Sequence, residues 1–555
     1  MNMHPPCMAG AGARGKPICL WPPCAGRVSG DDALDMAGQN PLSLDLALDL
    51  LPERFPGPGG VAVVVRNGKE AGARAWGYAG LESHQPMTRR TRLPICSISK
   101  QFTCGVLLAE LGEPEALDPL LPGFLPALAG PLPTVRQMCH NQSGLRDYWA
   151  MTVVEGARAE QTFGPNAALP MIAAIRSGHF APGQGYSYCN ANYRLLPELI
   201  RKAAGQELAD LYRRHIWGPA GMQGAVLTAD TRQPEDGVTG YEGNDSTGYF
   251  PADNGIFWVG DAGISASLDD MLAYEAWIDA TRDDPDSLYR RLSEPVAFAD
   301  GTPALYGFGI AHETVGGVAV TGHGGALRGF RAHRMNAREA RVSVVVMFNH
   351  EASARDAAAF LMRAALGQAE PVWQVPEPDW TGQWLCPSTG LIARLEPAGD
   401  GVKLHFATGP EMLRQQGPGV LASNETRVER RGAALRMQRR RDNIDTLLHP
   451  LPVAEIADGA AIAGEYLCAE TGSTLRLEAR DGAVFALFSG RLGQGRMEPV
   501  RPAGPDVWLL RTRRSMDAPA PGDWTLQIRR DARGAVRGLT LGCWLARGLE
   551  FIRPA

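Results

Sequence analysis

The stretch Pro94-Ile-Cys-Ser97-Ile-Ser-Lys100-Gln-Phe102 opens a predicted helix that runs from Ser97 to Leu111 and stops at Gly112. Residues three apart share one helix face, so the Ser97 hydroxyl and the Lys100 amine can meet. A serine hydroxyl is a weak nucleophile that needs a base, and a neighbouring amine can be that base. The helix start adds a positive field and a free N–H at Ser97, which suits half of an oxyanion hole. Alone, the spacing is weak evidence, and an N-capping serine beside a surface lysine would be the simpler interpretation.

A second motif, Tyr188-Cys-Asn190, follows Pro182-Gly183 and precedes another predicted helix. A tyrosine and an asparagine two apart on a loop can both point into one cleft. Tyr188 could then relay a proton between the nucleophile and the leaving group, and Asn190 could bind a substrate amide. Without other motifs, a packed loop tyrosine beside a turn asparagine explains the same residues.

The third motif is His323-Gly-Gly325-Ala326, in a predicted edge strand. Glycines in such a strand let an extended substrate lie close to the backbone. We expect His323 to donate a hydrogen bond to Tyr188 or to the substrate. The alternative is a tight turn with an exposed histidine.

Composition divides the rest of the chain. Residues 1–35 are rich in Gly, Pro and Ala, which predicts a disordered extension and makes Met36 a candidate translation start. Residues 36–367 mix helices with antiparallel-type strands, beginning with a hairpin around Asn67-Gly68. Residues 368–379 contain several prolines and predict a linker.

An internal repeat follows the linker. Gly382-Gln-Trp-Leu-Cys-Pro-Ser-Thr-Gly390 matches Gly464-Glu-Tyr-Leu-Cys-Ala-Glu-Thr-Gly472, and both copies continue into a strand and a second hairpin. Two small antiparallel β-barrels in tandem are the simplest explanation, over residues 380–457 and 458–555.

The three motifs, in this order, resemble those of the penicillin-recognising serine hydrolases in their class C β-lactamase-like branch. The resemblance implies a multidomain protein whose α/β catalytic domain combines an antiparallel sheet with helices. It also implies an oxyanion hole from the N–H groups of Ser97 and Ala326, with Gly325 and Asn190 binding substrate. Further segments resemble the D-aminopeptidase branch of that family, namely Pro94–Gly105, His140–Ala150, Asp261–Asp269, Thr321–Ala332 and Gly542–Leu549.

In that branch a loop of the last domain reaches the catalytic cleft. The resemblance places this specificity loop at Arg513, Arg514, Ser515, Met516, Asp517, Ala518, Pro519, Ala520, Pro521, Gly522 and Asp523. It implies that Asp517 meets the free α-ammonium of the substrate, because a desolvated carboxylate distinguishes a free amine from an acylated one. From the residues alone, a turn aspartate paired with Arg513 or Arg514 would be the simpler interpretation.

The function implied by this resemblance is a serine aminopeptidase that releases small N-terminal D-residues such as D-Ala from peptides, amides and esters. It would need no metal or organic cofactor, form a homodimer, and be open to inhibition by β-lactams. The alternatives are a β-lactamase, a D,D-carboxypeptidase or an esterase of the same family, or a non-catalytic binding or sensor protein on the same fold.

Charge and cysteine content exclude other classes. The formal net charge of −5 predicts no general attraction to nucleic acid. The sequence also lacks a run of 18 apolar residues, so it predicts no membrane-spanning helix. The proline-broken N-terminus lacks the pattern of a signal peptide, and ten thinly spread cysteines fit a reducing, cytoplasmic location. The arginine-rich stretch Arg427–Arg441 predicts a solvated hairpin rather than a nucleic-acid patch.

Overall fold

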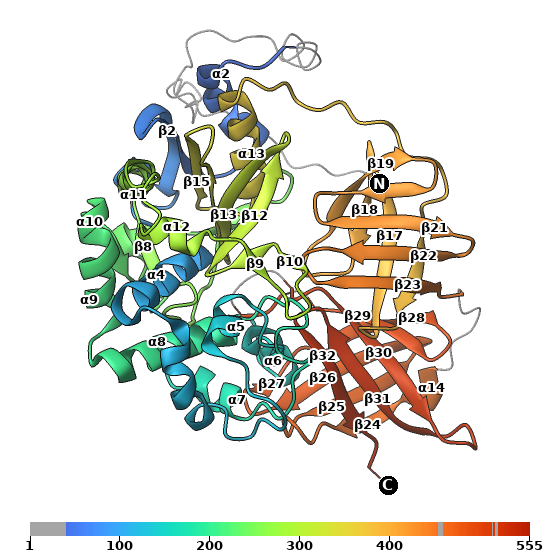
Figure 1. Ribbon diagram of the computed structural model, residues 1–555. Coiled ribbons are helices and arrows are strands. Elements are labelled where there is room, and N and C mark those ends of the chain that lie inside the picture. The colour runs from blue at the N-terminus through green and yellow to red at the C-terminus, as the bar shows by residue number, and fades with distance from the viewer. Residues whose placement is uncertain (1–39, 453–458, 513, 517–519, 555) are drawn as a thin grey trace, which may run out of the picture. The chain divides into compact units, whose positions relative to one another are not determined.

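The computed structural model describes residues 40–452, 459–512, 514–516 and 520–554. The expected extension over residues 1–35 and the candidate start Met36 lie outside this described part. No helix in the described ranges is long and apolar enough to cross a membrane. Residues 41–367, called here the N-terminal part, are followed by two closed antiparallel barrels, which Figure 1 shows in orange and red.

An eight-stranded sheet forms the centre of the N-terminal part, in the order β11-β12-β13-β14-β15-β1-β2-β3. Its strands are β1 (Gly59–Arg66), β2 (Lys69–Gly80), β3 (Gln85–Pro86), β11 (Tyr306–Gly307), β12 (Ile310–Val315), β13 (Val318–Leu327), β14 (Phe330–Ala337) and β15 (Val342–Phe348). The predicted hairpin is confirmed, since Asn67 and Gly68 connect β1 to β2 with φ values of 51° and 71°. Strands from both ends of this part meet where β1 pairs with β15.

Strand β1 shows why helices cover both faces of the sheet. Val61 and Val63 pack in one buried cluster with α4 (Ser99–Leu111) and α11 (Leu268–Ala280). The alternate residues Ala62 and Val64 pack in a second cluster with α2 (Leu44–Asp49) and α13 (Ala354–Ala365). Because successive strand residues face opposite sides, an unbroken apolar strand needs cover on both.

Most of the other helices lie between β4 and β8 in the chain. They are η1 (Cys96–Ile98), η2 (Pro114–Gly123), α5 (Val135–Cys139), α6 (Tyr148–Val154), α7 (Ala168–Ala173), α8 (Asn190–Ala204), α9 (Leu208–Tyr212), η3 (Arg213–Trp217), α10 (Gly218–Ala220) and η4 (Glu235–Gly237), with α3 (Leu51–Arg54) and α12 (Leu288–Leu292) outside that interval. Short strands accompany them: β4 (Leu93–Pro94), β5 (Val226–Leu227), β6 (Tyr241–Asn244), β7 (Gly248–Pro251), β8 (Ile264–Ala266), β9 (Val296–Ala297) and β10 (Pro303–Ala304).

The two barrels confirm the predicted fold class. The first consists of β16 (Gly382–Cys386), β17 (Leu391–Ala398), β18 (Gly401–His405), β19 (Glu411–Gly417), β20 (Val420–Ala422), β21 (Thr426–Arg431), β22 (Ala434–Arg439) and β23 (Ile444–Pro450). The second follows α14 (Gly459–Ile462) and consists of β24 (Gly464–Leu467), β25 (Thr474–Arg480), β26 (Ala483–Gly490), β28 (Glu498–Gly504), β29 (Val507–Arg511), β30 (Asp523–Arg530), β31 (Val536–Cys543) and β32 (Ala546–Ile552), with β27 (Gly493–Gln494) beside β26.

The internal repeat has a structural basis in one conserved turn geometry. Gly390 donates its N–H to the Cys386 carbonyl at 2.8 Å, and Gly472 donates to the Cys468 carbonyl at 2.9 Å. Both glycines have a positive φ, 69° and 71°, a conformation that side chains disfavour. The same turn therefore joins the first two strands of each barrel.

The arginine-rich stretch forms the predicted hairpin, β21 and β22, but the expectation of full solvation is wrong at its end. The Arg439 side chain is only 4% exposed and pairs with Asp442 and Glu411. Arg441 pairs with Glu425 of the same barrel and with Glu313 of β12. Arg439 is thus buried among residues of its own barrel, whereas the partly buried Arg441 contacts the N-terminal part through Glu313.

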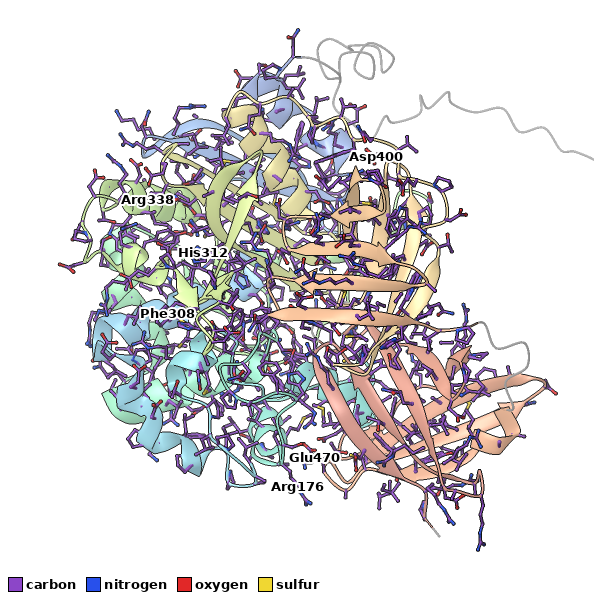
Figure 2. The ribbon with its side chains drawn as sticks, turned by 45° about the vertical axis from the view of Figure 1, so that its right-hand side comes forward. Arg176, Phe308, His312, Arg338, Asp400 and Glu470 are labelled. Atoms are coloured by element: carbon purple, nitrogen blue, oxygen red, sulfur yellow. The ribbon has the colours of Figure 1, made fainter. Side chains whose placement is uncertain are left out.

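The second barrel contacts the N-terminal part through Glu470, which follows the repeated Cys468. Arg146 donates to Glu470 Oε1 at 2.8 Å, and the Ser177 hydroxyl donates to Oε2 at 3.1 Å. The backbone N–H of Arg176 also donates to Oε1, and Figure 2 shows Arg176 and Glu470 side by side. The two copies of the repeat differ at this position, where Glu470 corresponds to Ser388, and the contact with the N-terminal part is made by Glu470 of the second copy.

Candidate active site

The predicted nucleophile lies on a strained turn. Ser97 is in the 3₁₀ turn η1, directly before α4, so the predicted helix is confirmed with a tighter first turn. The preceding Cys96 is fully buried and has a φ of 50°, a left-handed conformation that costs a non-glycine residue about 1–3 kcal/mol. Hydrogen bonds to β8 hold this turn, because Ile95 donates to the Ile264 carbonyl and Ile264 donates to the Ser99 hydroxyl. Ser97 itself stays partly exposed.

Lys100 is fully buried, and its amine has three oxygen neighbours. Its Nζ lies 3.1 Å from Ser97 Oγ, 2.8 Å from Asn190 Oδ1 and 2.6 Å from the Asp261 carbonyl oxygen. The amide and carbonyl oxygens can only accept hydrogen bonds, so they orient two N–H bonds of the amine. The remaining position of the nitrogen faces the Ser97 hydroxyl. The predicted pair is therefore brought together in the geometry that proton transfer needs.

Tyr188 and Asn190 both lie beside Lys100, as their spacing predicts. The Tyr188 ring centroid is 4.8 Å from Lys100 Nζ. Asn190 is the first residue of α8, and Asp147 fixes its amide: Nδ2 donates to Asp147 Oδ2 at 2.9 Å and the backbone N–H donates to Oδ1 at 3.2 Å. Because Asp147 binds the NH₂ group, the amide oxygen is turned to Lys100.

His323 is close to Tyr188, with ring centroids 6.0 Å apart, but its hydrogen bonds differ from the expectation. Nδ1 lies 2.5 Å from the Gly324 carbonyl, which only accepts, so this nitrogen carries the proton. Burial and the charge of Lys100 lower the pKa of His323 to about 3, and the neutral ring accepts from the Tyr306 hydroxyl through Nε2 at 3.0 Å. The expected donation from His323 to Tyr188 is thus wrong in this structure, because Tyr306 of β11 and Gly324 occupy both nitrogens, and donation to the substrate stays a prediction.

The strand that carries Gly325 and Ala326 is an edge only in its second half. β12 pairs with β13 as far as Gly322, and residues 323–327 have a strand neighbour, β14, on one side alone. The expectation of an edge strand is wrong for residues 318–322 and right for the segment that holds the motif. A Cβ on Gly325 would lie 2.2 Å from the Ile95 carbonyl oxygen, so only glycine lets this segment pack against the Ser97 turn. Ser97 and Ala326 therefore lie on adjoining backbone segments.

Comparisons with known proteins agree with this geometry. Residues 50–369 match the family model described as Beta-lactamase, and residues 374–552 match the model described as D-aminopeptidase, domain B. The chain is 58% identical to the D-aminopeptidase of Cereibacter sphaeroides over 511 residues, which are 92% of this chain and 99% of that one. This chain belongs to the D-aminopeptidase family. A D-aminopeptidase of Brucella ovis is 48% identical over 514 residues, 92% of this chain and 98% of that one.

Solved structures show the same fold at low identity. The octameric penicillin-binding protein homologue from Pyrococcus abyssi has a TM-score of 0.51 and 17% identity, and covers 73% of this chain and 99% of its own. A protein described as SurE has a TM-score of 0.50 and 18% identity over 92% of this chain and 98% of its own. The D-aminopeptidase family thus shares its architecture with penicillin-binding-protein-like structures.

The structure describes only part of the predicted specificity loop, residues 513–523. Arg513, Asp517, Ala518 and Pro519 lie outside the described residues. Ser515 and Met516 are buried, and Ala520, Pro521 and Gly522 lead into Asp523, the first residue of β30. Gly522 has a φ of 99°, and a Cβ there would lie 2.6 Å from the Ala407 carbonyl of the first barrel. The described ends of the loop are therefore held by other parts of the chain.

Arg514 joins this loop to the N-terminal part. Its Nη2 lies 2.5 Å from Glu242 Oε1, while Arg328 Nη2 donates to Glu242 Oε2 at 2.8 Å. Its Nη1 lies 3.6 Å from Glu351, which also binds Arg331 at 3.1 Å. Arg328 and Arg331 flank the turn between β13 and β14, so the same two carboxylates hold the loop and the strand end that follows Ala326.

Three residues of the site escape sequence reasoning. Asp147 and Asp261 lie in segments that resemble D-aminopeptidases, which was the only available signal for either. The Tyr148 hydroxyl donates to Asp261 Oδ2 at 2.7 Å, and Asp147 orients Asn190. Tyr306 carries no motif at all, and its role follows only from the position of β11 next to His323. Among the described residues, no cluster of His, Cys, Asp and Glu could hold a metal ion.

The lowered pKa of His323 gives a prediction for stability. An unfolded histidine has a pKa near 6.5 and the buried one about 3, so below pH 6.5 the unfolded state binds the proton first. Stability should therefore fall as the pH drops from about 6.5 towards 3, by up to about 1.4 kcal/mol per pH unit for this group. In a pH series of thermal unfolding midpoints, His323→Asn should show a shallower loss than the wild type. The exposed His449→Asn variant is the control, and equal slopes for all three proteins would contradict the assignment.

Proposed function

We propose that this protein is a serine aminopeptidase that releases small N-terminal D-residues, such as D-Ala, from peptides, amides and esters through an acyl-enzyme. The observation that carries this proposal is the Lys100 amine, which lies 3.1 Å from Ser97 Oγ while Asn190 Oδ1 and the Asp261 carbonyl oxygen accept hydrogen bonds from it. Relatives at 58% and 48% identity bear the name D-aminopeptidase, which supports the substrate class.

The reaction begins with attack of Ser97 Oγ on the carbonyl carbon of the first substrate residue. Lys100 takes the hydroxyl proton, and the N–H groups of Ser97 and Ala326 stabilise the oxyanion. The C–N bond breaks, the amine leaves with a proton delivered through Tyr188, and the D-acyl group stays on Ser97 as an ester. Water then attacks the ester, gives its proton to the Lys100–Tyr188 pair, and releases the free D-amino acid and the Ser97 hydroxyl.

Three further residues bind or support in this proposal. Asn190 uses the second hydrogen of its NH₂ group on the substrate, and Gly325 lets the substrate backbone lie along β13. His323 stays neutral and acts through Tyr306, which it holds near Tyr188. Its role is to shape the pocket in which Tyr188 moves its proton.

Substrate selection falls to Asp517 of the loop 513–523. A carboxylate shielded from water binds the positively charged α-ammonium of a free N-terminal residue. An acylated amine carries no charge and cannot form this ion pair. The same loop would shorten the cleft and leave no space for an N-acyl extension. The neighbouring Arg514 clamp supports this part of the proposal, because it fastens the loop beside the strand end that follows Ala326.

Loss of this clamp should weaken selection without stopping the chemistry. We expect Arg514→Ala to lower kcat/KM for D-alanine p-nitroanilide by about 10-fold, mainly through KM, because a small displacement of the binding loop has a large effect. Discrimination against N-acetyl-D-alanine p-nitroanilide should fall as well. The matched control is Arg511→Ala, since Arg511 is half exposed and pairs with Asp523 at the base of the loop. Equal effects of the two substitutions on both substrates would contradict a special role for Arg514.

The alternatives make different use of the same cleft. A β-lactamase, D,D-carboxypeptidase or esterase accepts acylated amines, and a binding or sensor protein acylates and stalls. The deciding screen compares D- and L-alanine p-nitroanilide, N-acetyl-D-alanine p-nitroanilide and a β-lactam. The proposal requires steady turnover of the free D-substrate and little of the other two amides. Preference for the acetylated compound would favour the alternatives, and a burst without turnover would favour a sensor.

Other parts of the proposal concern organisation. Domain borders are proposed at 36–367, 368–379, 380–457 and 458–555, and limited proteolysis in the linker would test them. We also propose that the protein forms a homodimer, and analytical ultracentrifugation would test this. The substrate screen above would test inhibition by β-lactams. A reducing, cytoplasmic location is also proposed, and the ten thinly spread cysteines of the sequence support it.

A further inference from the structure

The segment Gly183–Cys189, which leads to Asn190 and carries Tyr188, has no helix or strand of its own. The hydrogen bonds of such a segment must come from its surroundings. Within the N-terminal part, Gly183 donates to the Gln142 carbonyl and Ser187 donates to the Asn141 carbonyl. Further contacts come from the two barrels, whose residues lie more than 240 positions further along the chain.

The first barrel contacts this segment through the turn between β22 and β23. The guanidinium of Arg441 lies 6.0 Å from the centre of the Tyr186 ring, and Tyr186 donates its N–H to the Asp442 carbonyl at 3.5 Å. Asn443 donates to the Gln184 carbonyl at 3.0 Å. One short turn of the barrel thus meets the segment at two successive points.

The second barrel contacts it through the turn between β31 and β32. The Ser187 hydroxyl donates to the Trp544 carbonyl at 3.3 Å, and the Tyr186 and Trp544 rings lie 6.0 Å apart. Asp147, which orients Asn190, donates its own N–H to the Leu545 carbonyl at 3.0 Å. A continuous series of contacts therefore runs from Leu545 through Asp147 and Asn190 to the Lys100 amine.

The two turns also bind each other. The Asp442 side chain is fully buried and accepts from Trp544 Nε1 at 3.0 Å and from Arg439 Nε at 2.6 Å. Asp442 lies in one barrel and Trp544 in the other, and both touch Tyr186. A displacement of either turn would therefore be passed to the same loop.

We infer that Asp442 and Trp544 are positioning residues, which lock the two barrels together against the Tyr186–Ser187 backbone and so set Tyr188 and Asn190 relative to Lys100. The barrels then contribute to the reactivity of Ser97 itself, in addition to the selection attributed to the loop 513–523. This role also gives a function to Trp544 within Gly542–Leu549, a segment that the proposed mechanism does not use.

The test measures how fast a fluorophosphonate phosphonylates Ser97 in the full-length protein, a reaction that forms a P–O bond and releases fluoride, followed by mass spectrometry across a pH series. Trp544→Phe keeps an aromatic ring but removes the N–H donor to Asp442 and part of the buried ring system, and we expect phosphonylation about 10-fold slower. Asp442→Ala should slow it by about 100-fold, the size that misplacement of a catalytic group can reach. The double variant should be no slower than Asp442→Ala alone, because both changes remove the same interaction. The midpoint of the pH profile should shift with the rate, as a purely structural role would not require.

The matched control is Asp445→Ala, three positions from Asp442 in the same barrel. Asp445 is half exposed and pairs with Arg436 inside that barrel, so phosphonylation should stay at the wild-type rate. The inference is overturned if folded Trp544→Phe protein is phosphonylated at the wild-type rate and with the wild-type pH midpoint, if Asp445→Ala is as slow as Asp442→Ala, or if the effects of Trp544→Phe and Asp442→Ala add. Should Asp442→Ala not fold, Trp544→Phe decides alone. Although the inference rests on the proposed nucleophile, the reaction with fluorophosphonate does not depend on D-specificity. Wild-type protein that is phosphonylated but does not cleave D-alanine p-nitroanilide would therefore refute the substrate proposal and leave this one standing.

Discussion

The Lys100→Met variant should hydrolyse D-alanine p-nitroanilide at least about 10⁴-fold more slowly than the wild type, the size of loss seen when the base of an activated serine is removed. The Lys100 amine contacts Ser97 Oγ and is the proposed base. Methionine has a similar size and fills the buried space, but its sulfur is too weak a base to take the hydroxyl proton. The loss should fall on kcat, because the amine acts on the hydroxyl proton and not on the bound substrate.

Controls separate this chemical loss from damage to the fold. Removing the amine leaves Asn190 Oδ1 and the Asp261 carbonyl without their donor, at a cost of about 1–3 kcal/mol in stability. Thermal unfolding must therefore be followed in parallel, and Lys100→Gln, which retains a donor, gives a second variant. The exposed Lys202→Met is the matched control and should keep wild-type rates. Turnover within about 10-fold of wild type in folded Lys100→Met would contradict the assignment of the base.

The Asp517→Asn variant should reverse the preference for a free amine. Removing one partner of a shielded charge pair costs about 2–5 kcal/mol, so kcat/KM for D-alanine p-nitroanilide should fall by about 30- to 5000-fold. N-acetyl-D-alanine p-nitroanilide makes no such pair, and its kcat/KM should be unchanged or higher. The ratio of the two values is the measurement, because it cancels any general loss of activity.

Asp523→Asn is the matched control for this prediction. Asp523 ends the same loop, but its carboxylate pairs with Arg511 at 3.2 Å and with Arg394 at 3.6 Å inside the barrels. Its replacement should leave the ratio at the wild-type value. A ratio that stays unchanged in Asp517→Asn, or that changes equally in Asp523→Asn, would remove Asp517 from recognition of the ammonium group.

Local spacing explains which features the sequence could predict. Ser97 and Lys100 share a helix face, Tyr188 and Asn190 are two apart on a loop, and each pair needs little of the fold to come together. The hairpin at Asn67-Gly68 and the repeated turns at Gly390 and Gly472 depend on backbone conformations that a few residue types adopt. Such features depend on neighbours in the chain.

Features that depend on packing between distant segments could not be predicted in this way. The partner of His323 is Tyr306 because β11 lies beside β12, and the sequence around residue 306 contains no motif. The burial of Arg439 follows from its pairing with Glu411 and Asp442 in other parts of the first barrel, although the adjacent Arg440 is exposed. Asp442 and Trp544 meet from separate barrels, so neither position alone indicates the other.

The central claim is that Ser97, activated by Lys100, carries the acyl group of a D-residue. It is tested most directly by rapid quenching of the full-length protein with D-alanine p-nitroanilide, followed by proteolysis and mass spectrometry. The account predicts that the peptide containing Ser97 gains the mass of one alanyl group in the wild type, and that the gain is absent in Ser97→Ala. Steady release of D-alanine with no alanyl ester at Ser97, or the same release by Ser97→Ala, would contradict it.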